Sequence, residues 1–176
     1  MKFRNTEIIT TSRLLLHSIT NNDDSDLKDI LVNEEIGKTF MLPDFKSEDE
    51  ITAMINRFKA LSESSDRFVY GIYLDDKMIG FINDVEIRDD HVELGYVIHP
   101  NFKGNGYATE ALRVAISEIF ASGFYTVRTG AFYGNDASIR VMQKCGMSKE
   151  AYEDEIEYKG IIHRCVYYNI KNKNPL

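Results

Sequence analysis

The spacing of apolar residues in the first part of the chain predicts one strand followed by a helix. Apolar and polar residues alternate over 13–19, which is typical of a half-buried strand. The polar run at 20–24 ends this strand. Apolar residues then recur three and four positions apart, which predicts a first helix that Asp24 or Ser25 caps and that carries Leu27, Ile30 and Leu31.

A second helix is predicted from residue 47 onward. Ser47 and Glu50 form a capping-box pattern, in which each side chain bonds a backbone N–H at the other end of the first turn. The apolar face of this helix consists of Ile51, Met54, Ile55, Phe58 and Leu61. We expect these two helices and the loop between them to form part of the wall around a substrate.

From residue 68 the apolar spacing changes from helical to alternating. Three antiparallel strands are predicted at 68–74, 78–86 and 92–98, with polar turns between them. A glycine-rich turn at 103–106 follows the third of these strands. It opens into a helix whose apolar positions are Ala108, Ala111, Leu112, Ala115, Ile116, Ile119 and Phe120.

The last part of the chain contains both alternating and helical spacing of apolar residues. A strand is predicted at 125–130, a short helix at 135–145, and a final hairpin with strands at about 148–157 and 161–170. The resulting order predicts an α/β (α+β) fold with a mixed, mostly antiparallel sheet of about seven strands and about four helices. A chain of 176 residues is long enough to bury one core, so we expect a single domain over 1–176.

Composition and charge narrow the functional classes. With 43% hydrophobic and 28% charged residues, no apolar run of membrane-spanning length and no signal peptide, the chain is expected to be a cytoplasmic protein without a membrane partner. A net charge of −7 disfavours nucleic acid as a partner and favours the approach of an amine or a basic protein. Cys145 and Cys165 are expected to be buried thiols, and no Cys or His has metal-ligand spacing, so no metal is expected.

The turn formed by Lys103, Gly104, Asn105 and Gly106 is a candidate phosphate site. Glycines let the backbone turn tightly and approach a ligand, and the first N–H groups of the following helix point at it together with the positive end of the helix dipole. A mononucleotide P-loop would place its Lys after the glycines and follow it with Ser or Thr. A dinucleotide fingerprint would have three spaced glycines in an early parallel unit. Neither pattern fits this turn.

The segment resembles the acetyl-CoA loop of the GCN5-related N-acetyltransferases (GNAT). The family pattern Gln/Arg-x-x-Gly-x-Gly/Ala is met by Lys103, Gly106 and Ala108, with Lys in place of Gln or Arg. The segments TSRLLLHSI, ELGYVIHP, GYATEAL and NDASIRVMQKCGM are similar to the branch that acetylates protein N-termini, including those of ribosomal proteins (RimJ/RimL type). This resemblance covers nearly the whole chain and implies the GNAT fold, in which the fourth and fifth strands splay apart.

The resemblance also implies where acetyl-CoA binds. Its phosphates would lie on the glycine-rich turn, and its pantetheine arm would bond the backbone of the preceding strand as an added strand does. Asn135 is expected to cap its helix and to bond the pantetheine amide, and Lys144 either contacts the adenosine phosphate or is a solvated cation at a helix end. The expected cofactor-binding residues are Tyr96, Val97, Ile98, Lys103, Gly104, Asn105, Gly106, Tyr107, Ala108, Thr109, Asn135 and Lys144.

Two residues are candidates for catalysis. Glu93 could draw a proton from the ammonium form of the acceptor through water, or it could be a solvated strand carboxylate. The usual acid of the family is a Tyr on the last helix, and Met142 occupies that position here. Ser138 is therefore the candidate to protonate the CoA thiolate, and the alternative is a hydroxyl that bonds only the backbone.

Three functions are compatible with the sequence. The resemblance implies an acetyl-CoA-dependent N-acetyltransferase that modifies a primary amine, most simply a protein N-terminal α-amine, and it allows for a homodimer. A polyamine or an aminoglycoside-like acceptor also suits the acidic charge. The missing Tyr acid leaves a non-catalytic acyl-CoA sensor as the third. Phe40, Phe45 and Tyr133 are expected to line the acceptor pocket.

Overall fold

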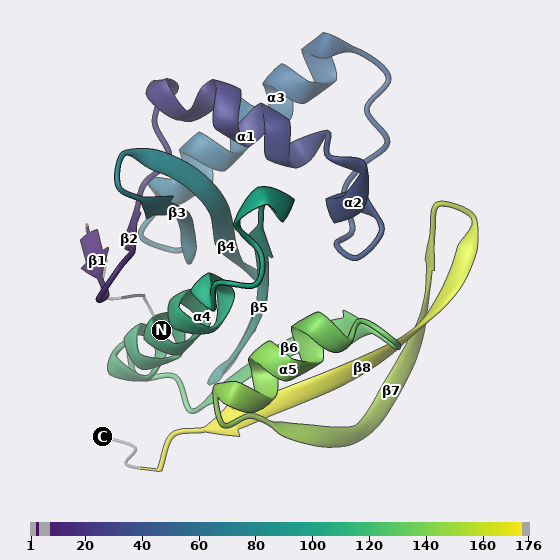
Figure 1. The fold of residues 1–176 in the computed structure, drawn as a ribbon. Coiled ribbons are helices and arrows are strands. Elements are labelled where there is room, and N and C mark those ends of the chain that lie inside the picture. Colours follow the sequence, from purple (N-terminus) through teal and green to yellow (C-terminus); the bar gives the residue numbers. More distant parts are fainter. Residues whose placement is uncertain (1–2, 4–7, 174–176) are drawn as a thin grey trace.

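The fold is one twisted sheet between two layers of helices (Figure 1). The computed structural model describes residue 3 and residues 8–173. Within these residues, eight strands lie in the order β1-β2-β3-β4-β5-β6-β8-β7. The strands are β1 (Ile8–Thr10), β2 (Leu15–His17), β3 (Val69–Leu74), β4 (Lys77–Arg88), β5 (His91–Ile98), β6 (Thr126–Phe132), β7 (Ser148–Tyr158) and β8 (Ile161–Lys171).

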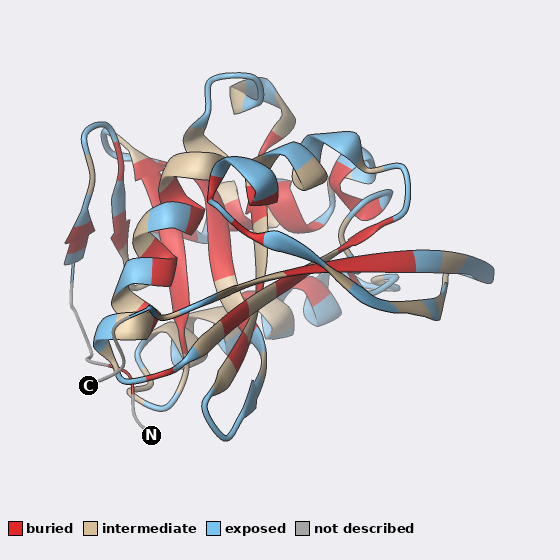
Figure 2. Cartoon of the chain, turned by 90° about the horizontal axis from the view of Figure 1, so that it is seen from below, coloured by how far each residue is buried: buried red, intermediate tan, exposed pale blue. Residues whose placement is uncertain are grey.

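Two hydrophobic cores join the helices to the sheet. The α-helices are α1 (Asp24–Leu31), α2 (Glu34–Gly37), α3 (Glu48–Ser62), α4 (Tyr107–Ala121) and α5 (Asp136–Lys144). On one face, α1 and α3 bury apolar side chains against Phe81 and Val97, and on the other, α4 and α5 pack on Leu94 and Val127. The strands between these layers are the most buried part of the chain (Figure 2). None of the helices described is long and apolar enough to cross a membrane.

The sheet is antiparallel except where β5 meets β6, and there the two strands part. They pair in parallel only from His91 opposite Thr126 to Leu94 opposite Thr129. Beyond this point β5 stays bonded to β4 as far as Ile98, while β6 stays bonded to β8. The predicted splay of the fourth and fifth strands, which are β5 and β6 in the structure, is therefore confirmed, as is the mostly antiparallel fold.

The structure corrects the sequence prediction near the N-terminus. It contains two short elements that the apolar spacing does not reveal, β1 and α2, and the strand expected at 13–19 is only β2. Neither Asp24 nor Ser25 caps the first helical segment. Thr20 does so, because its hydroxyl accepts from the Asn22 N–H and the Asp23 carboxylate accepts from the Thr20 N–H at 2.7 Å.

The start of α3 follows the predicted pattern in part. The hydroxyl of Ser47 accepts from the Glu50 N–H, as a capping box requires. The carboxylate of Glu50, however, accepts from the N–H of Lys46 at 2.6 Å. The return bond therefore lies one residue earlier than expected, and it still satisfies a backbone donor at the helix start.

A buried ion pair fixes the bulge in β4, the strand that supports β5. The pairing of β4 with β5 shifts between Asp84 and Glu86. The side chain of Asp84 is only 1% exposed and is held by Arg67 at 2.6 Å and by the Phe68 N–H at 2.7 Å. A buried carboxylate needs such partners because it has lost its hydration.

We expect Asp84→Ala to lower the free energy of unfolding by about 1–3 kcal/mol, because it leaves the buried N–H of Phe68 without its acceptor and removes the charged partner of Arg67. Urea unfolding followed by circular dichroism measures this loss. Arg88→Ala is the matched control, since the pair of Arg88 with Glu86 is exposed, and it should change stability by about 0–1 kcal/mol. Equal effects of the two substitutions would contradict the structural role of Asp84.

Candidate active site

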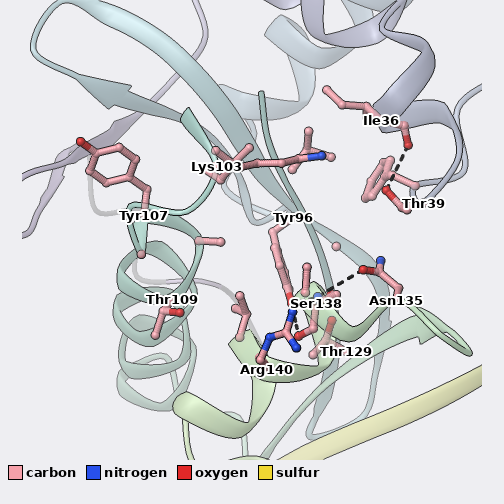
Figure 3. Close-up of a pocket in the computed structure, with 18 of the residues that line it drawn as sticks. Ile36, Thr39, Tyr96, Lys103, Tyr107, Thr109, Thr129, Asn135, Ser138 and Arg140 are labelled. Atoms are coloured by element: carbon pink, nitrogen blue, oxygen red, sulfur yellow. Dashed lines mark hydrogen bonds between the residues drawn. The ribbon is translucent and has the colours of Figure 1, made fainter. Parts of the chain in front are cut away.

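A cavity of about 480 Å³, here called the splay cavity, lies at the splayed strands. It extends from the glycine-rich turn past the unpaired edge of β5 to the first turns of α5 (Figure 3). Its lining residues are Ile36, Thr39, Phe40, Gly95, Tyr96, Val97, Ile98, Phe102, Lys103, Gly104, Gly106, Tyr107, Ala108, Thr109, Thr129, Gly130, Asn135, Ala137, Ser138, Arg140, Val141 and Lys144.

The glycine-rich turn has the backbone geometry of an anion cradle. Gly104 and Gly106 both have a φ of +82°, which glycine adopts without strain. A β-carbon at Gly104 would meet no atom within 4 Å, so this backbone is open to a ligand. Gly106 is also the N-cap of α4, and no side chain among the described residues caps the helix there. The first N–H groups of α4 are therefore available to an anion.

A network of polar side chains braces this cradle from behind. The carboxylate of Glu110, in the first turn of α4, accepts from the Thr11 hydroxyl at 2.6 Å and from Arg13 Nε at 2.8 Å. Arg13 Nη1 also donates to the carbonyl of Asn105 in the cradle at 3.0 Å. The N-terminal segment thus fixes both the helix start and the turn before it.

The same network sets the charge of Glu110. Burial alone would raise the pKa of this carboxyl, but the hydrogen bonds from Thr11, Arg13 and Ser12 outweigh it and lower the pKa to about 2. Glu110 is therefore ionised at neutral pH. Its negative charge is paired with Arg13 rather than directed at the cradle.

The charge of the splay cavity is opposite to that of the whole chain. Lys103, Arg140 and Lys144 line it, and no carboxylate occurs among the lining residues that the structure describes. The chain as a whole carries a net charge of −7. Such a local excess of cations at a helix N-terminus favours a ligand with several phosphates.

The structure brings nearly all of the expected cofactor-binding residues to this cavity. Every one of them lines it except Asn105, whose side-chain amide donates to the carbonyls of Phe102 and Lys103. Asn105 thus shapes the turn from outside the cavity. Asn135 caps α5 as expected, because its side-chain oxygen accepts from the Ser138 N–H at 3.2 Å.

The two candidate catalytic residues lie in different places. Ser138 lines the splay cavity, and its hydroxyl is 2.7 Å from the hydroxyl of Tyr96 (Figure 3). Met142 is fully buried in the core and faces no ligand. Glu93 does not line the splay cavity. It lines a second cavity of about 620 Å³, here called the acidic cavity, on the face of β5 opposite to Tyr96.

The acidic cavity surrounds a partly buried ion pair. Arg128 Nη1 contacts Glu93 at 3.0 Å, its Nε lies 3.3 Å from Glu150, and its guanidinium stacks on the ring of Tyr167. Burial raises the pKa of Glu93, although Arg128 acts against this shift. The other residues lining the cavity are Val85, Glu86, Arg88, Tyr152 and Asp154.

The two cavities come close at Gly95, which lies two residues beyond Glu93 on the same face of β5. A β-carbon at Gly95 would meet the ring of Phe40 at 3.0 Å and Val85 at 3.2 Å. Of the residues expected to line an acceptor pocket, Phe40 lines the splay cavity, whereas Phe45 packs in the core with α1 and α3 and Tyr133 is largely exposed.

The loop that carries Phe40 is fastened to the β7–β8 hairpin. The hydroxyl of Tyr158 accepts from the Leu42 N–H at 3.2 Å and lies within bonding distance of the Phe40 and Leu42 carbonyls. Lys159 pairs with Asp44 at 3.0 Å. These contacts join the tip of the β7–β8 hairpin to the loop after α2.

Sequence reasoning missed Arg13, Glu110, Arg128 and Arg140. Arg13, Glu110 and Arg128 act through contacts with residues far apart in the chain, and such contacts cannot be predicted from a local pattern. Arg140 could have been predicted to line the site, because it lies four residues before Lys144 on the same helix and so near the same face. No cluster of three or more potential metal ligands occurs in the part of the chain that the structure describes.

We expect Glu110→Gln to lower the free energy of unfolding by about 1.5–3 kcal/mol at neutral pH, because the variant loses charged hydrogen bonds at the start of α4. The pKa of Glu110 falls from 4.5 to about 2 on folding, so this contribution is present above pH 4.5 and is lost as the pH falls toward 2. The difference between wild type and variant should therefore close over that range in urea unfolding. The exposed Glu34→Gln should show no such closure.

Comparison with known proteins identifies the family. The profile described as "Acetyltransferase (GNAT) domain" matches residues 13–148. The uncharacterized N-acetyltransferase YoaA of Bacillus subtilis (strain 168) is 29% identical over 167 residues, which are 92% of this chain and 89% of YoaA.

Solved structures have the same fold. RimL, a ribosomal L7/L12 α-N-protein acetyltransferase solved with coenzyme A, is 18% identical with a TM-score of 0.81, covering 94% of this chain and 98% of RimL. The acetyltransferase of Salmonella typhimurium that modifies the N-terminal serine of ribosomal protein L7/L12 is also 18% identical, with a TM-score of 0.81 over 95% of this chain and 100% of its own. The chain therefore belongs to the GNAT acetyltransferase family, as an acyltransferase whose cosubstrate is acetyl-CoA.

Proposed function

We propose that the protein transfers the acetyl group of acetyl-CoA to the α-amine of a protein N-terminus, with a cytoplasmic protein of the ribosomal type as acceptor. The observation that carries this proposal is the course of the splay cavity. It runs from a cationic cradle through the gap between β5 and β6 to Gly95 and Phe40, beside the acidic cavity. A thioester held in the gap is thereby offered to an amine on the opposite face.

The residues of the cavity fit acetyl-CoA. The open cradle and the cations Lys103, Arg140 and Lys144 suit its phosphates. The edge of β5 beyond Leu94, released from β6, suits the amide groups of pantetheine. When bound, acetyl-CoA supplies a thioester carbonyl, and a backbone N–H near Val97 or Ile98 would stabilise the oxyanion that forms on it.

Glu93 is the proposed base. Its pKa is raised by burial, which moves it toward the pH at which an enzyme works and makes it a better proton acceptor. It is two residues from Gly95, a strand distance of about 7 Å, so a water molecule would carry the proton from the amine. Ser138, on the other side of the gap, is the proposed partner of the CoA sulfur.

The acidic cavity favours a positively charged acceptor. Four carboxylates line it, from Glu86, Glu93, Glu150 and Asp154, against the two guanidinium groups of Arg88 and Arg128. An ammonium group is attracted to this excess of negative charge. RimL and the Salmonella enzyme have the same fold as this chain and act on ribosomal protein L7/L12, which supports a protein N-terminus as the acceptor. The acidic cavity also suits a small polyamine, which is the second candidate.

An acceptor panel tests the proposal. Purified protein and acetyl-CoA are incubated with an unblocked peptide beginning with serine, the same peptide with an acetylated N-terminus, and spermidine, and the release of free thiol is followed. We expect turnover with the unblocked peptide only. Turnover with spermidine alone would replace the protein acceptor by a small amine, and no turnover with any amine would contradict the proposal.

We expect Glu93→Gln to lower kcat by about 10²–10⁴-fold, the usual contribution of a general base. Glu150→Gln is the matched control, because this carboxylate contacts the same guanidinium and has nearly the same exposure, 17% against 16%. The Glu150→Gln variant should change kcat by less than about tenfold. Glu150 lies on β7, which is separated from β5 by β6 and β8 in the sheet, and so it is farther from the reacting amine. Equal losses in both variants would assign the effect to the ion-pair cluster as a whole.

A further inference from the structure

We propose that Tyr96 is a positioning residue, whose phenolic hydroxyl donates to Ser138 and thereby turns the hydrogen of Ser138 toward the sulfur of CoA. The inference rests on the proposed function and adds a residue from a different element of the fold. In other members of the family a Tyr on the last helix acts as the acid, and here Met142 occupies its position. A tyrosine hydroxyl from β5 would therefore act at the CoA sulfur through Ser138.

The geometry links the strand to the helix across the floor of the splay cavity. Tyr96 lies on the part of β5 that has left β6, and its ring packs against the core beneath α4 and α5. Its hydroxyl lies 2.7 Å from the hydroxyl of Ser138 and 3.2 Å from the carbonyl of Ser138. The N–H of Ser138 is held by Asn135. Ser138 is therefore fixed on both sides, as the labelled side chains in Figure 3 show.

The one hydrogen of the phenol decides what Ser138 can do. When Tyr96 donates to the Ser138 carbonyl, the Ser138 hydroxyl can donate to the phenolic oxygen, and its hydrogen is used. When Tyr96 donates to the Ser138 hydroxyl, at the shorter distance, the hydrogen of Ser138 is free to point into the cavity. A negative charge on sulfur favours the second arrangement, because each hydrogen bond in the chain polarises the next.

Tyr96 and Ser138 act by hydrogen bonding, and neither gives up its proton. Burial raises the pKa of the phenol, so Tyr96 remains a donor throughout. In the reaction the amine nitrogen forms a bond to the acetyl carbon, the carbon–sulfur bond breaks, and its electron pair goes to sulfur. The proton that nitrogen loses passes through water to Glu93 and from there to the solvent, and the departing thiolate takes up one proton from that solvent, so no net proton is gained or lost. The hydroxyl pair stabilises the thiolate between these events.

The test measures the thiol pKa of bound CoA, through the ultraviolet absorbance of the thiolate as the pH is raised. This readout needs no acceptor and is insensitive to a purely structural role. A hydrogen bond to a charged group stabilises the charge, so we expect the thiol pKa to be about one to two units lower in wild type than in Tyr96→Phe or Ser138→Ala. The double variant should match Ser138→Ala, because the phenol acts through Ser138.

Two further variants control the measurement. Ser138→Thr keeps a hydroxyl at the same place and should retain the lowered thiol pKa. Tyr168→Phe removes the hydroxyl of another buried tyrosine, which does not line the cavity, and should titrate as wild type. Thermal unfolding checks that each variant is folded, and if Tyr96→Phe is not, the comparison of Ser138→Ala with Ser138→Thr still tests the hydroxyl at position 138.

The outcomes separate this inference from the proposed function. A thiol pKa in Tyr96→Phe equal to that of wild type, with a raised value in Ser138→Ala, would overturn the role of Tyr96. An unchanged value in both variants would overturn the role of the pair. Failure of wild type to bind CoA would instead contradict the proposed function, and failure to acetylate any amine while the thiol pKa shifts would leave the hydroxyl pair supported.

Discussion

The parting of β5 from β6 is the constraint on which the rest of the structure depends. A strand inside a sheet normally bonds on both edges, and a buried backbone N–H or C=O without a partner is costly. Beyond Leu94 and Thr129 each of the two strands keeps only its outer neighbour. The freed edge of β5 is a set of backbone groups that a ligand with alternating donors and acceptors can satisfy. In the proposed complex, the amide groups of pantetheine would satisfy these backbone groups.

The structure around the unpaired edge of β5 is held in place at both ends by contacts between distant parts of the chain. On one side the Arg13–Glu110 network holds the cradle, joining residues 97 apart in sequence. On the other, Tyr158 fastens the loop that carries Phe40 to the last hairpin. Between them the hydroxyls of Tyr96 and Ser138 meet across the gap. These contacts join elements far apart in the chain, and the splay cavity is therefore shaped by tertiary contacts.

The difference between local patterns and tertiary contacts explains how much of the fold and of the site the sequence could predict. The alternation in β3, β4 and β5, the helical spacing in α4 and the tight turn at the cradle glycines are local properties, and all were predicted. The short elements β1 and α2 contain too few residues to show a period. The cap at Thr20 was missed because several polar residues in succession could each serve. The partner of Ser138 lies on another element, so no spacing pattern contains it.

The alternation of β5 separates the two halves of the proposed reaction. Side chains three positions apart on a strand face opposite sides, so Glu93 points to the acidic cavity and Tyr96 to α5. The amine would lose its proton on a face lined by carboxylates, and the sulfur would gain its hydrogen bonds on a face lined by cations. Negative charge on the acceptor face disfavours the phosphates of CoA there, and positive charge in the splay cavity disfavours an ammonium. In the proposed reaction the sheet would therefore keep the acetyl donor and the amine acceptor on separate faces, and the acetyl group would pass through the gap between β5 and β6.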